Sequence, residues 1–71
     1  MDAKNPGNQG FTAGDLVTVK SMPQDERFCI IGFKESASGE KMAILKALFN
    51  DTYIIEKPLS LLQTLLIKGI L

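Results

Sequence analysis

The sequence predicts an all-β fold, a small barrel of about five strands, from three observations. Residues 17–20 alternate apolar and polar side chains, residues 28–33 ("FCIIGF") are rich in aromatic and β-branched residues, and "TYIIE" repeats that character at residues 52–56. The chain has 71 residues, which is enough for one small domain. We expect that domain to span residues 11–71, after a disordered leader over residues 1–10 that is rich in Asn, Gly and Gln.

The first predicted strand follows a turn at Gly14-Asp15. Val17 and Val19 share one face of it, and Pro23 with its polar neighbours ends it. The second strand carries Phe28 and Ile30 on one face and Cys29, Ile31 and Phe33 on the other. Because both faces are apolar, we expect this strand to be central, with a bulge or strong bend at Gly32.

Residues 40–49 ("EKMAILKALF") leave two alternatives open. Met42, Leu45 and Phe49 have the spacing of a helix face, which would make the fold α+β. The stretch 40–49 is equally compatible with a strand that has Ala43, Leu45, Ala47 and Phe49 on one face. In that interpretation Asn50-Asp51 makes a hairpin turn and residues 52–56 return as the next strand, and this is the arrangement that we favour.

The order of these signals resembles a small SH3-like β-barrel, and in particular the YodC-like family of small uncharacterised bacterial proteins. The resemblance covers residues 11–63 and depends on Phe11, Gly14, Asp15, Val17, Lys20, Ser21, Pro23, Gly32, Phe33 and "LFND" at 48–51. Met22 stands where the family has glycine after Lys-Ser. The resemblance implies a 3₁₀ turn in "KPLSLLQ" before the last strand, with Leu59 and Leu62 plugging the end of the barrel. It implies no catalytic residue.

Composition disfavours an enzyme. The chain has no histidine and one cysteine, Cys29, which we expect to be a small core residue. There is no phosphate-binding loop of the Gly-x4-Gly-Lys-Ser/Thr type, and we expect no cofactor and no metal site. The first ten residues lack the apolar region of a secretory signal, and the single cysteine suits a reducing compartment, so we expect a cytoplasmic protein.

The residues after the predicted 3₁₀ turn form an apolar tail. Residues 64–71 include five Leu or Ile side chains, whose burial would contribute at most about 7–15 kcal/mol. The tail is too short for a membrane span, which needs about 20 apolar residues. It could be the last strand of the barrel, or it could bind a second copy or another protein. The candidate interface residues are Leu65, Leu66, Ile67, Ile70 and Leu71.

A second candidate binding surface consists of Met22, Pro23, Phe33 and Tyr53, in or beside predicted loops. Packing in the core is the competing interpretation for Phe33 and Phe49. Eight Lys/Arg residues balance eight Asp/Glu residues and do not cluster, whereas nucleic-acid binders usually carry a basic excess. We therefore expect a non-catalytic protein-interaction module that self-associates through its tail. The alternative is a weak RNA- or DNA-binding barrel of the KOW or Sm-like type.

Overall fold

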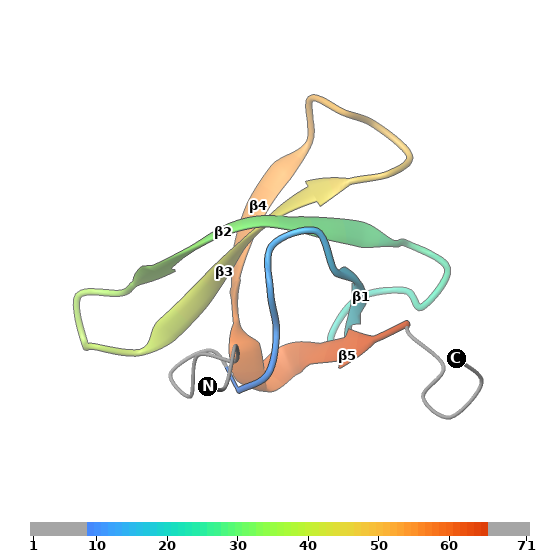
Figure 1. The fold of residues 1–71 in the computed structure, drawn as a ribbon. Helices are drawn as coiled ribbons and strands as arrows, with labels where there is room; N and C mark the ends of the chain where they lie inside the picture. Colours follow the sequence, from blue (N-terminus) through green and yellow to red (C-terminus); the bar gives the residue numbers. More distant parts are fainter. Residues whose placement is uncertain (1–8, 66–71) are drawn as a thin grey trace.

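A computed structural model describes residues 9–65 and confirms the all-β prediction (Figure 1). Its elements are β1 (Leu16–Val19), β2 (Phe28–Glu35), β3 (Lys41–Ala47), β4 (Ile54–Pro58), the 3₁₀ turn η2 (Leu59–Leu61) and β5 (Leu62–Thr64). The five strands form one antiparallel sheet in the order β4-β3-β2-β1-β5. The helix considered for residues 40–49 is wrong, because β3 occupies this stretch and pairs with both β2 and β4.

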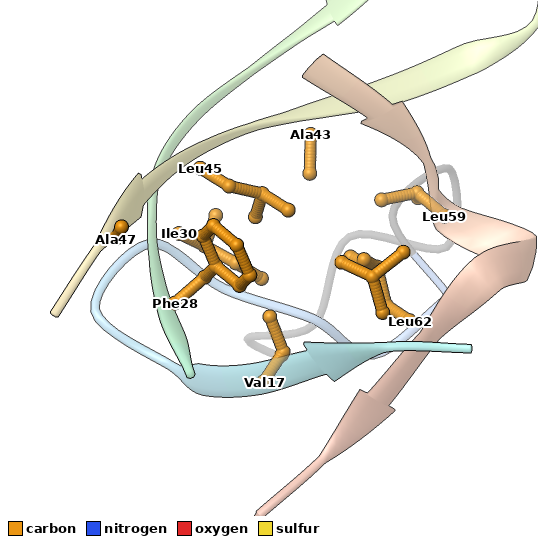
Figure 2. Close-up of a cluster of buried hydrophobic side chains, with 9 residues drawn as sticks. Val17, Phe28, Ile30, Ala43, Leu45, Ala47, Leu59 and Leu62 are labelled. Carbon is orange, nitrogen blue, oxygen red and sulfur yellow. The ribbon is translucent and has the colours of Figure 1, made fainter. Parts of the chain in front are cut away.

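The sheet bends around a single apolar core (Figure 2). β1 and β5 supply one side, while β2, β3 and η2 supply the other. Ala43, Leu45 and Ala47 alternate with half-buried residues along β3, as a strand with one core face requires. The buried side chains are Val17, Val19, Phe28, Ile30, Ala43, Leu45, Ala47, Leu59 and Leu62.

The predicted bulge is present in β2, which is the central strand of the sheet. Ile30 pairs with Leu45 and Gly32 pairs with Ile44, so Ile31 is the extra residue. A Cβ atom at Gly32 would lie 3.5 Å from Cδ1 of Ile44, which is an ordinary contact, so the bulge does not require glycine. The extra residue reverses the alternation of faces, and Phe33 therefore packs against the core. Its predicted position on the face of Cys29 and Ile31 is wrong.

The turn between β3 and β4 is wider than the predicted Asn50-Asp51 turn. The backbone N–H of Tyr53 donates to the carbonyl oxygen of Asn50 at 2.9 Å, which centres the turn on Asp51 and Thr52. Asn50 Oδ1 accepts hydrogen bonds from the backbone N–H of Thr52 at 3.0 Å and from its hydroxyl at 2.7 Å. The Asn50 side chain thus stabilises the turn with local hydrogen bonds, in a segment where β3 and β4 are no longer paired.

The 3₁₀ turn and the plug at the end of the barrel are confirmed. Pro58 precedes η2 with φ −65°, and the side chains of Leu59 and Leu62 are 2% and 5% exposed. β5 then runs antiparallel to β1, with Val17 opposite Thr64. The backbone N–H of Leu65 donates to the carbonyl oxygen of Leu16 at 3.0 Å. Thr64 and Leu65 therefore belong to the barrel edge and not to a surplus tail.

The expected leader and most of the candidate interface lie at the two ends of the chain. Gln9 and Gly10 form a turn, and the rest of the expected leader lies outside the described residues. Leu66, Ile67, Ile70 and Leu71 of the candidate interface also lie outside the described residues.

Candidate interaction surface

The largest group of exposed apolar side chains lies on the hairpin between β3 and β4, which projects at the top of Figure 1. Leu48 and Phe49 are each 55% exposed, Ile54 is 52% exposed and Tyr53 is 39% exposed. We call these four residues the hairpin surface. Exposed apolar side chains that are grouped on one hairpin are typical of binding sites, whereas singly scattered ones are not. Tyr53 and Ile54 are adjacent in the chain and therefore point to opposite faces of the hairpin.

The hairpin surface is held in place by the core. The ring centroids of Phe28 and Phe49 lie 5.9 Å apart at an interplanar angle of 76°, an edge-to-face contact. Tyr53 lies 6.3 Å from Phe28 and 5.8 Å from Phe49. Phe28 is fully buried, so it gives the two exposed rings a fixed support. Aromatic side chains that are ordered before binding lose little conformational freedom when a partner arrives.

A backbone contact fixes the base of the same hairpin. The N–H of Leu48 donates to the carbonyl oxygen of Arg27 at 2.9 Å, and the N–H of Ala47 donates to that of Tyr53 at 3.0 Å. The first bond ties the hairpin to the residue just before β2. The backbone hydrogen bonds of the sheet therefore continue into the base of the hairpin.

The structure does not bring the four predicted binding residues together. Met22 and Phe33 are half-buried and pack against the core, while Pro23 is exposed in the loop between β1 and β2. Phe33 lies five residues along β2 from Phe28, about 16 Å at the rise of a strand, so it is remote from the hairpin surface. Only Tyr53 belongs to that surface. Sequence reasoning underrated Phe49, for which core packing was the competing interpretation.

Gln24 holds the loop between β1 and β2 against the sheet. Its Oε1 accepts a hydrogen bond from the buried hydroxyl of Thr18 at 3.0 Å. Its Nε2 donates to the carbonyl oxygens of Val19 at 2.9 Å and Met22 at 3.0 Å. The loop that carries Met22 and Pro23 is therefore closed onto β1 by one side chain.

Cys29 does not lie in the core, contrary to the prediction. It is half-buried and lies on the outer face of the sheet, the face away from the core. In the sheet, Cys29 is paired with Leu16 on β1 and with Lys46 on β3. The alternation along β2 explains this position, because Phe28 and Ile30 on either side of it are both buried.

Two ion pairs join charged side chains of different strands. Lys34 Nζ lies 3.2 Å from Glu56 Oε1, and Lys41 Nζ lies 4.0 Å from Glu35 Oε2. Within residues 9–65, no group of three or more His, Cys, Asp or Glu side chains is placed to hold a metal ion. That part of the chain also contains no helix with the length and apolar character that a membrane crossing requires.

Comparison of the chain with protein-family models, curated proteins and solved structures found no match. The resemblance to the YodC-like family therefore remains a prediction from the motifs.

Proposed function

We propose that this chain is a non-catalytic protein-interaction module that self-associates, with its apolar C-terminal segment as part of the interface. The observation that carries the proposal is the hairpin surface, where four apolar side chains are exposed and the rings of Phe49 and Tyr53 pack on the buried Phe28. An interface is usually centred on aromatic and aliphatic anchors of this kind.

The C-terminal segment adds to this argument. Six residues follow Leu65, and four of them are Leu or Ile. Burying each such side chain contributes about 1.5–3 kcal/mol. A second copy offers both the apolar surface that these side chains need and a cover for its own exposed hairpin.

The nucleic-acid alternative has no observation in its favour among the described residues. Lys34 and Lys41 each lie beside a carboxylate, which opposes phosphate binding at those positions.

Sedimentation of the full chain over a range of concentrations tests the proposal. We expect a dimer or larger species that dissociates on dilution. The full-length double variant Ile67→Asn/Ile70→Asn should sediment as a folded monomer. Ile31→Asn is the matched control, because Ile31 is 47% exposed outside both proposed contact regions, and this variant should still associate. A wild-type chain that stays monomeric at high concentration would show the proposal to be wrong.

A further inference from the structure

The unpaired edge of the sheet at β4 can bind a further strand. β4 is the last strand in the sheet order, so within the described part of the chain it pairs on one side only, with β3. The N–H of Ala47 donates to the carbonyl oxygen of Tyr53, and Leu45 faces Ile55 in the same register. Hydrogen-bonded pairs alternate along an antiparallel ladder. The backbone N–H and C=O groups of Ile54 and Glu56 therefore point away from β3.

This edge is suited to receive an added strand. An exposed edge strand presents its unpaired backbone groups to any extended segment that reaches it. Ile54 begins β4 and Tyr53 directly precedes it, and these two exposed residues point to opposite faces, so a strand placed beside this edge would find an apolar neighbour on each face. Strand addition of this type takes its affinity from main-chain hydrogen bonds and its specificity from alternate side chains.

We propose that residues 66–70 of a second copy add to the β4 edge as an antiparallel strand, with Lys68 opposite Glu56. This inference rests on the proposed self-association and names the contact that produces it. Lys68 is the one charged residue of the segment, and Glu56 is the one carboxylate of β4. In this register Ile70 lies opposite Ile54, and Leu71 follows beside Tyr53.

The electrostatics agree with this register. The side chain of Glu56 is 47% exposed, and one of its oxygens already lies near Lys34. A carboxylate accepts several hydrogen bonds through its two oxygens, so it can also bind Lys68. Leu66 would lie opposite Pro58, whose nitrogen has no proton to donate, so the ladder ends there.

We assign the segment to another copy because Leu65, the residue before it, is bonded to β1 and not to β4 in its own chain. The proposed register requires Leu66 at the η2 end of β4, beside Pro58. In the same chain β5 leads away from η2, and Leu65 is bonded to Leu16 on β1. Three residues of β5 span about 10 Å, which exceeds the distance of about 4.8 Å between paired strands. Two copies can exchange these segments reciprocally, as in a two-fold dimer.

Disulfide trapping between two differently labelled full-length chains tests the register. In a Cys29→Ser background, one chain carries Ile54→Cys and the other carries Ile70→Cys. Directly opposed residues have Cα atoms about 5.5 Å apart, within the range of a disulfide, so mild oxidation should give the mixed dimer as the main product. Ile31→Cys mixed with Ile70→Cys is the control, and it should give little product although Ile31 is about as exposed as Ile54.

Several outcomes would overturn the proposal. Equal trapping through Ile31→Cys would show that the contact is not specific to the edge. Stronger trapping between Ile54→Cys and Leu66→Cys would show a parallel strand. If one chain that carries both Ile54→Cys and Ile70→Cys closed an internal disulfide and stayed monomeric, the segment would cover its own sheet. A chain that dimerises by sedimentation but traps none of these pairs would refute the edge contact alone, whereas a monomeric chain would refute the proposed function as well.

Charge reversal gives an independent test. Glu56→Lys and Lys68→Glu should each weaken dimerisation by about two- to fivefold per contact, as a lost cross-strand ion pair does. The double variant should restore the affinity of the wild-type chain. An additive loss in the double variant would contradict the pairing of these two residues.

Discussion

The two ends of this small barrel use the same kinds of side chain in opposite ways. At the η2 end, Leu59 is 2% exposed and plugs the barrel with Leu62. On the hairpin surface, Leu48 is 55% exposed and lies beside the equally exposed Phe49. Both leucines follow a strand directly, so the difference is not one of local sequence.

The difference comes from what covers each end. At the η2 end the chain turns back as β5 and pairs with β1, and Leu59 lies in the same buried cluster as Val17, Val19 and Leu62. The β3–β4 hairpin continues past the point where β1 and β5 can cover it, as Figure 1 shows. Phe49 and Tyr53 contact the buried Phe28, and the four apolar side chains of the hairpin surface stay exposed within the described part of the chain. The hairpin surface is therefore an extension of the core that no described residue covers.

The largest effect that we expect separates the two leucines. Leu59→Ala should lower the free energy of unfolding by about 2–5 kcal/mol, because it leaves a cavity in the plug. Leu48→Ala should change it by less than about 0.5 kcal/mol, as exposed substitutions usually do. Urea denaturation of dilute protein measures both. Equal losses would show that the hairpin is covered within the monomer.

A smaller effect is expected from the loop that closes over β1. Gln24→Ala should destabilise the fold by about 1–2 kcal/mol, because the buried Thr18 hydroxyl loses its acceptor. Gln63→Ala is the matched control, since Gln63 is exposed on β5 and faces Thr18 in the strand register. Thermal unfolding of the two variants should separate them. Identical midpoints would mean that water replaces Gln24 without cost.

The smallest effect concerns the support of the hairpin surface. Phe49→Leu keeps an apolar side chain but removes the edge-to-face contact with Phe28, which should cost about 0.5–1.5 kcal/mol. Tyr53→Leu should cost no more, because the Tyr53 ring is tilted at a longer distance of 6.3 Å from Phe28. Urea midpoints of both variants test this order. A larger loss from Tyr53→Leu would place the main support of the hairpin at Tyr53.

Much of the fold could be predicted because it depends on local chemistry. Alternation located β1, the β-branched stretch located β2, and the bulge was expected at Gly32. The 3₁₀ turn and the burial of Leu59 and Leu62 were expected from the resemblance to SH3-like barrels. The choice between strand and helix for residues 40–49 needed the sheet, because those residues satisfy both periodicities and only pairing with β2 and β4 decides between them.

The positions of the four predicted binding residues were harder to predict. Tyr53 is exposed, as expected for a phenol, whereas Met22 and Phe33 pack against the core. Phe33 was assigned to the wrong face because a bulge shifts the alternation by one residue. The position of the bulge within β2 decides which of the later residues change face. Two successive isoleucines at 54 and 55 do signal that one faces outward, since neighbours in a strand lie on opposite faces.

The amino-acid sequence was sufficient to predict the fold class, because it contains short strands with one apolar face each, separated by turn residues. Those properties follow from backbone preference and from the cost of exposing apolar side chains, which act within a few residues. Only the tertiary structure decided which strand lies at the edge, which leucine is covered, and where Cys29 and Phe49 point. These depend on how five strands order and bend around one core, and no short stretch of the chain contains that information.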